Sequence, residues 1–123
     1  MDWLAALTLV AIFASVVASA AGQTNGSTPL RFGQSCALTG RAQALGIGMR
    51  NGILAAFEEA NAANVLPGTK LELITYDDGY EPEPAVANTR RLIVEDEVFA
   101  LIGEVGTPTS KVALPVAEEI KKR

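Results

Sequence analysis

One stretch of the sequence decides the fold: Val98-Phe99-Ala100-Leu101-Ile102-Gly103-Glu104-Val105-Gly106-Thr107-Pro108-Thr109-Ser110. Its first five residues form an unbroken apolar run, which is typical of a strand covered on both faces of a sheet. Two glycines then let the chain leave the sheet, and Pro108 suits the first position of a helix. The stretch therefore predicts a buried strand that passes directly into a helix, as in an α/β fold.

The start of this helix is a candidate binding site for an anion. The backbone N–H groups of the turn at Gly106 and the hydroxyls of Thr107, Thr109 and Ser110 can all donate hydrogen bonds. The positive end of the helix dipole adds to the attraction for a carboxylate or a phosphate. A simpler role remains open, in which Thr107 is the N-cap of its own helix and binds nothing else.

Two further pairs of strand and helix precede this unit. Residues 30–38 alternate as a strand does, and the following segment has apolar residues at three- and four-residue steps, which predicts a helix ending near Ala63. The apolar face of that helix consists of Leu45, Met49, Ile53, Ala56, Phe57 and Ala60. Residues 70–76 form the second predicted strand. A second helix begins near Pro84 and ends within residues 95–97.

The element order β-α-β-α-β-α predicts an α/β domain with a parallel sheet. Right-handed crossovers and a reversal of winding after the second strand give the spatial order 2-1-3. In that order the carboxyl ends of the first and third strands flank one crevice. We therefore expect Thr39, Leu45 and Thr107 to face one ligand site at this edge of the sheet.

The N-terminal residues have the pattern of a secretory signal. Residues 4–17 are an apolar run that ends in the small residues of the segment 18–22. This pattern predicts a cleaved signal peptide over residues 1–21, a linker over residues 22–29 and a domain over residues 30–123. Asp2 is the only charge before the run, so a different start codon or a membrane anchor also remains open. Cleavage leaves about 100 residues, enough for one modest domain.

Composition excludes several classes of function. The chain has 14 acidic and 10 basic residues, and no basic patch is evident, so we expect no nucleic-acid partner. It has no histidine and a single cysteine, Cys36, which excludes an internal disulfide and metal sites built on Cys or His. Without a histidine base, nucleophilic catalysis by a serine or threonine lacks its usual partner. We therefore expect a protein that is not an enzyme and uses no cofactor and no metal.

Two local motifs carry weaker signals. The segment 46–52, Gly-Ile-Gly-Met-Arg-Asn-Gly, departs from the spacing of a dinucleotide fingerprint, and glycines on a helix packed close to the sheet explain it better. Asp77 and Asp78 could bind a divalent metal with Glu81 and Glu83 in an exported enzyme, but the spacing does not match a calcium-binding EF-hand loop. We expect turn and capping roles for the two aspartates.

A set of motifs occurs in one order along residues 30–119. They are Ala37-Leu38-Thr39-Gly40 before Gly46, then Tyr76-Asp77-Asp78, Pro82, residues 85–93 and Leu101-Ile102-Gly103. Together they resemble the branched-chain amino-acid (Leu/Ile/Val) binding family, the substrate-binding proteins of ABC importers. The resemblance implies a partial first lobe of a periplasmic-binding type I fold. It also implies an N-terminal fragment, since the family continues into a fourth strand and a second lobe.

The resemblance also implies a function. Such a protein captures a branched-chain or related amino acid, or another small carboxylate, in the periplasm and delivers it to an ABC permease in the membrane. Thr107 matches the position that grips the ligand carboxylate, and Leu45 matches a position that can line the side-chain pocket. Tyr80 and Gly106 match a disulfide pair of other members. The expected ligand-binding residues are Thr107, Leu45, Thr39, Gly106 and Thr109. A ligand-sensing domain of the same fold, which reports to a receptor or regulator, remains the alternative.

Overall fold

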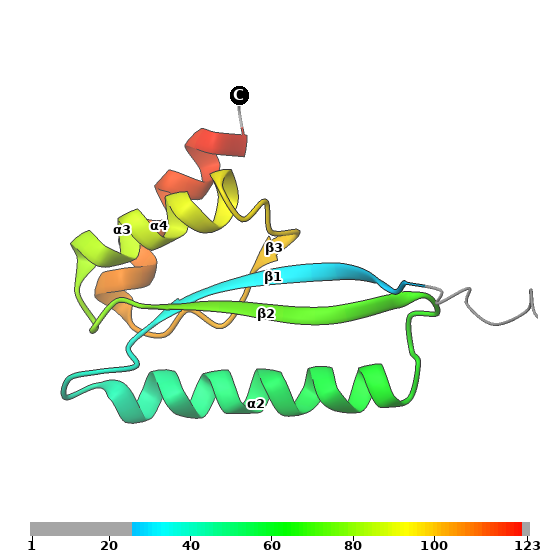
Figure 1. Ribbon diagram of the computed structural model, residues 1–123. Helices are drawn as coiled ribbons and strands as arrows, with labels where there is room; N and C mark the ends of the chain where they lie inside the picture. The colour runs from blue at the N-terminus through cyan, green and yellow to red at the C-terminus, as the bar shows by residue number, and fades with distance from the viewer. Residues whose placement is uncertain (1–25, 122–123) are drawn as a thin grey trace, which may run out of the picture.

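The computed structural model describes residues 26–121, which form a parallel sheet with helices on both faces (Figure 1). The elements are β1 (Thr28–Cys36), α2 (Gln43–Ala62), β2 (Thr69–Asp77), α3 (Pro82–Val94), β3 (Ala100–Leu101) and α4 (Thr107–Lys121). Figure 1 shows α2 along one face of the sheet and α3 and α4 together on the other. The predicted signal peptide lies outside the described residues.

The three strands have the predicted order, β2-β1-β3, and both pairings are parallel. β1 pairs with β2 over its whole length, from Thr28 opposite Thr69 to Cys36 opposite Asp77. With β3 it shares only two positions, Phe32 with Ala100 and Gly33 with Leu101. The α/β class and the order 2-1-3 are therefore confirmed. Since β1 and β3 are neighbours, their carboxyl ends lie at one edge of the sheet.

The third strand is shorter and more exposed than its sequence predicts. The apolar run was expected to be covered on both faces, but β3 has two residues and the Phe99 side chain is 69% exposed. Leu101 and Ile102 are half-buried. Within residues 26–121, β3 has a single strand neighbour, so its outer edge is not paired. An apolar run predicts burial only where enough of the surrounding chain covers it.

Helix α2 buries only part of its predicted apolar face. Ile53 is buried and the ring of Phe57 packs on Phe32, with the ring centroids 5.2 Å apart. Leu45 and Met49 at the start of the helix are 56% and 44% exposed. The periodicity correctly predicted the helix, but the three-stranded sheet is too narrow to cover the whole stripe.

The glycines of α2 differ in their surroundings. A Cβ atom at Gly46 would lie 2.7 Å from the carbonyl carbon of Ala37 and would also overlap the Ala37 carbonyl oxygen. A Cβ atom at Gly48 or Gly52 would meet nothing within 4 Å. Close packing on the sheet therefore explains Gly46, as predicted, and does not explain the other two glycines.

The main core lies between β1 and the pair α3 and α4. Leu92 of α3 is fully buried over Gly33, where a Cβ atom would lie 3.0 Å from a Leu92 methyl carbon. Ala113 and Val116 of α4 complete this layer, and α4 continues through Pro115. No helix within residues 26–121 combines the length and the apolar character needed to cross a bilayer.

A side chain of α2 covers part of the outer edge of β2. The Asn61 amide donates a hydrogen bond to the carbonyl oxygen of Leu71 and accepts one from the Leu71 N–H, both at 2.9 Å. This pair of bonds replaces those that a neighbouring strand would make. Asn61 therefore protects the edge of β2 from pairing with another chain.

Candidate ligand-binding site

Three loops meet at the carboxyl edge of the sheet: residues 37–42 after β1, residues 78–81 after β2 and residues 102–106 after β3. The loop after β2 contacts both of the others. On one side, Gly79 lies close to Thr39, since a Cβ atom at Gly79 would be 3.9 Å from Thr39 Oγ1. On the other side, the Tyr80 ring lies against Gly106, the pair that the family resemblance placed together.

Asp77, the last residue of β2, joins the first two loops. Its Oδ1 atom accepts hydrogen bonds from the N–H groups of Leu38 at 2.8 Å, Thr39 at 3.3 Å and Gly79 at 2.9 Å. Its Oδ2 atom accepts a bond from the Thr39 hydroxyl at 2.6 Å. Desolvation acts to raise the pKa of Asp77, but the bonds from Thr39, Leu38 and Gly79 outweigh it and hold the pKa below its ordinary value. Asp77 therefore stays ionised at neutral pH.

Asp78, the first residue after β2, lies buried beneath the same carboxyl edge of the sheet. It is almost fully buried, and its carboxylate accepts bonds from the Ser35 hydroxyl at 2.9 Å and from the Tyr80 N–H at 2.8 Å. Asn88 of α3 donates to Ser35 Oγ at 3.2 Å and to the Asp77 carbonyl oxygen at 3.0 Å. The turn role predicted for the aspartates is confirmed by their bonds to Gly79 and Tyr80.

Sequence reasoning missed the roles of Ser35 and Asn88 in this network. The available signal was Gln34-Ser35, two polar residues inside the central strand, because a buried polar side chain needs a partner. Gln34 follows the same rule: it is fully buried, and its amide donates to the Gly103 carbonyl oxygen at 2.8 Å. It also accepts a bond from the Thr75 hydroxyl at 3.2 Å. These side chains tie the three strand ends together.

The start of α4 differs by one residue from its prediction. The helix begins at Thr107, and the carbonyl oxygen of Gly106 accepts the first helical bond from the Ser110 N–H at 2.9 Å. Gly106 is therefore at the N-cap position, which was expected for Thr107. It has a positive φ of 113°, a conformation that favours glycine. Thr107 is exposed at the first turn of the helix, where its hydroxyl can reach a ligand.

The five predicted site residues have different exposure. Thr39, Leu45 and Thr107 are exposed, and Gly106 is half-buried. Thr109 is buried. Its hydroxyl donates a shared hydrogen bond to two carbonyl oxygens, that of Val105 at 3.1 Å and that of Gly106 at 3.0 Å. Thr109 thus lies beneath the helix start and holds it together. No group of three or more Cys, Asp or Glu side chains in the described part of the chain is arranged to bind a metal ion.

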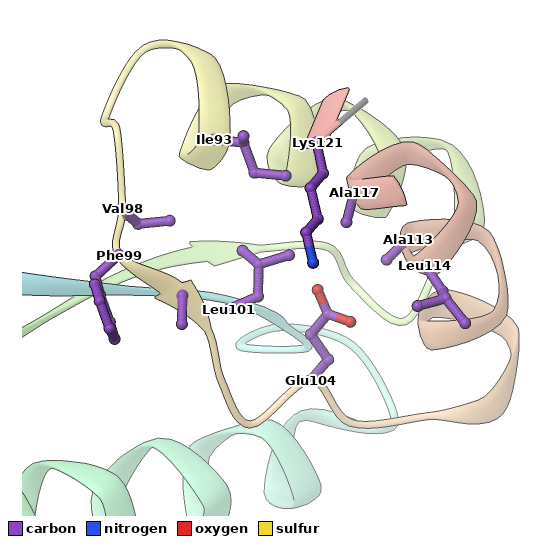
Figure 2. Close-up of a pocket in the computed structure, with 10 residues that line it drawn as sticks. Ile93, Val98, Phe99, Leu101, Glu104, Ala113, Leu114, Ala117 and Lys121 are labelled. Atoms are coloured by element: carbon purple, nitrogen blue, oxygen red, sulfur yellow. The ribbon is translucent and has the colours of Figure 1, made fainter. Parts of the chain in front are cut away.

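A separate groove of about 410 Å³ lies between β3 and the helices α3 and α4 (Figure 2). Its walls are mostly apolar, from Ile93 of α3, Leu101 of β3 and Leu114 of α4. Figure 2 shows Glu104 and Lys121 pointing toward one another across it. The Glu104 Oε1 atom is buried and has no hydrogen-bond partner. Desolvation, with a smaller contribution from the charge of Asp78, raises the pKa of Glu104.

Comparison with known proteins places this architecture in a family. The family model for periplasmic binding proteins matches residues 29–122. The chain belongs to the periplasmic binding protein family. The Leu/Ile/Val-binding protein BraC3 of Rhizobium johnstonii is 32% identical over 112 residues, which make up 91% of this chain and 29% of that protein. The predicted membership in a periplasmic binding protein family is thus confirmed, and the chain is similar to a member named as a Leu/Ile/Val-binding protein.

Solved structures of periplasmic binding proteins share the fold. A possible leucine/isoleucine/valine-binding protein from Rhodopirellula baltica has a TM-score of 0.76 at 53% identity, over 78% of this chain and 26% of its own. A solute binding protein of an ABC transporter from Rhodopseudomonas palustris, in complex with 3,4-dihydroxy benzoic acid, has a TM-score of 0.67 at 27% identity, over 76% and 25%. The chain therefore spans between a quarter and three tenths of the length of these relatives.

Proposed function

We propose that this chain forms part of the ligand site of an extracytoplasmic solute-binding protein that serves an ABC importer. The ligand is a branched-chain or related amino acid, or another small carboxylate. The observation that carries the proposal is the edge where three loops meet and where the start of α4 presents Thr107. The names of the relatives support the ligand class, since they include a Leu/Ile/Val-binding protein and a protein solved with an aromatic acid.

The helix start is suited to the carboxylate of such a ligand. The first N–H groups of an α-helix have no acceptor within the helix, and the dipole favours a negative charge there. The Thr107 hydroxyl can add a charge-assisted hydrogen bond at the same place. Leu45, exposed on the first turn of α2, offers an apolar surface to the ligand side chain.

Thr39 is suited to a different part of the ligand. Its hydroxyl proton is donated to Asp77, so the Thr39 oxygen can offer a ligand only its lone pairs. A lone pair next to an ionised carboxylate attracts a donor such as an ammonium group. The edge thus offers donors at α4 and an acceptor at Thr39, which matches the two charged groups of an amino acid.

The proposed partner is an ABC permease in the membrane, and the proposed location is the periplasm, reached through a cleaved signal peptide. The signal-like pattern of residues 1–21 and the family membership support both. In this role the protein binds and releases its ligand and catalyses no reaction.

Titration of the ¹⁵N-labelled chain with L-leucine, L-isoleucine, L-valine and 3,4-dihydroxybenzoate, followed by NMR, tests the proposal. We expect at least one of them to shift the amide signals of residues 106–110, and L-leucinamide, which lacks the carboxylate, to leave them in place. Thr107→Val should weaken the affinity several-fold, while Thr107→Ser, which keeps the hydroxyl, should not. The proposal fails if no carboxylate shifts these signals, or if Thr107→Val binds as the wild type does.

A further inference from the structure

We infer that Asp77 is a positioning residue for the ligand site: it fixes the loop of residues 37–42 against the end of β2 and so holds Thr39 in place. The inference rests on the function proposed above. Asp77 ends β2, and in the order β2-β1-β3 this strand is separated from β3 by β1. The ligand crevice is expected between the loops that follow β1 and β3, so Asp77 lies outside these two loops. Its effect on binding is therefore exerted through the loop.

The hydrogen bonds of Asp77 connect two segments that are distant in sequence. Three of them come from the loop after β1, namely the Leu38 and Thr39 N–H groups and the Thr39 hydroxyl, and one comes from Gly79 in its own turn. A carboxylate that accepts backbone N–H groups makes stronger bonds than a neutral acceptor does. Asp77 therefore binds Leu38 and Thr39, the second and third residues of the loop, to the end of β2.

The rest of the loop has contacts that do not orient Thr39. The Gln43 N–H bonds to the Gly40 carbonyl oxygen at 3.3 Å and the Leu45 N–H to that of Ala42 at 3.0 Å, and both bonds close local turns. Gly46 packs on the Ala37 backbone and fixes the distance between α2 and the sheet. These contacts set the position of the helix, whereas the direction of the Thr39 hydroxyl depends on Asp77.

The loss of Asp77 would have two effects on a bound ligand. The loop would gain conformational freedom, and binding would then have to order it again, which weakens affinity. The Thr39 hydroxyl would also lose its acceptor, so its proton could point toward the ligand and repel an ammonium group. Both effects reduce affinity although Asp77 itself does not touch the ligand.

The test compares Asp77→Ala and Asp77→Asn with a matched control, Asn61→Ala. The control removes two hydrogen bonds to Leu71 near the opposite end of the same strand and leaves the loop intact. Urea unfolding first gives the folded fraction of each variant, and NMR titration with L-leucine then gives its affinity. We expect Asp77→Ala to bind about tenfold more weakly than the wild type at equal folded concentration. Asn61→Ala should stay within about twofold, and Asp77→Asn, which keeps one acceptor oxygen, should lie between.

Amide hydrogen exchange provides a second measurement that needs no ligand. Exchange at Leu38 and Thr39 should be faster in Asp77→Ala, or in Asp77→Asn if the alanine variant does not fold, than in Asn61→Ala. Equal exchange in these variants overturns the inference, as does an equal loss of affinity in Asn61→Ala. A wild-type chain that binds no L-leucine contradicts the proposed function for this ligand alone, and the exchange rates then decide whether Asp77 positions the loop.

Discussion

The contact between Gly46 and Ala37 leads to a sharp prediction for a single methyl group. Gly46→Ala places a Cβ atom 2.7 Å from the Ala37 carbonyl carbon and 2.9 Å from the Ala37 nitrogen, where ordinary contacts lie between 3.4 and 4 Å. The obstacle is the backbone of the segment after β1, which cannot rotate away as a flexible side chain can. The start of α2 must therefore move away from the sheet.

The expected cost follows from two opposing effects. Overpacking of a tight contact typically costs about 1–3 kcal/mol, and the rigid backbone at Ala37 places this site in the upper part of that range. Alanine favours a helix over glycine by roughly 1 kcal/mol. We expect Gly46→Ala to lower the free energy of unfolding by about 2 kcal/mol.

Two glycines of the same helix supply the control. A Cβ atom at Gly48 or Gly52 would meet nothing within 4 Å, so only the helix preference remains. Gly48→Ala and Gly52→Ala should therefore raise the free energy of unfolding by about 0.5–1 kcal/mol. Urea denaturation followed by far-UV circular dichroism measures all three variants. The reasoning is refuted if Gly46→Ala is as stable as the two controls.

Three further predictions concern buried groups. Because burial raises the pKa of Glu104 above its ordinary 4.5, the folded state binds this proton more tightly than the unfolded state, and stability falls as pH rises through the range above 4.5. Glu104→Gln should add roughly 1 kcal/mol at pH 7 and less at pH 4 in urea titrations; an equal gain at both would contradict this assignment. Burial, together with the charges of Asp78 and Asp77, raises the pKa of Cys36 to about 11. A thiol reagent at pH 8 should therefore label Cys36 only after the chain unfolds. Rapid labelling of the native chain would show that the thiol is accessible. Leu92→Ala should cost about 2–5 kcal/mol in thermal or urea unfolding, and a loss below 1 kcal/mol would mean that the core is not centred there.

Local sequence patterns predicted the helices well. The apolar spacing of residues 45–60 indicated α2, and the helix start predicted near Pro84 lies two residues after the observed start of α3 at Pro82. Winding rules then predicted the order 2-1-3. The exposure of Leu45 and Phe99 was not predictable in the same way, because burial depends on how much of the chain surrounds each element.

The candidate site shows the same division. A helix start near Thr107 was predictable because the sequence changes from an apolar run to hydroxyl residues within a few positions, and the role of Thr107 and Gly106 in ligand binding stays a prediction. The direction of the Thr109 side chain was not predictable, because it depends on the winding of the first helical turn. That turn directs the Thr109 hydroxyl toward the carbonyl oxygens of Val105 and Gly106. Asp77 was correctly expected to form a turn, yet its bonds to Leu38 and Thr39 gave no signal in either segment.

By itself, the sequence determined the order of the elements, the parallel sheet and the start of α4 to within one residue, since these follow from periodicity and from turn residues that act on near neighbours. Only the tertiary structure decided that Asp77 holds the loop after β1, that Gly46 presses on Ala37 and that Asn61 closes the edge of β2. These contacts join residues that are nine to 39 positions apart. They depend on distances and directions that exist only once the strands have paired and the helices have packed.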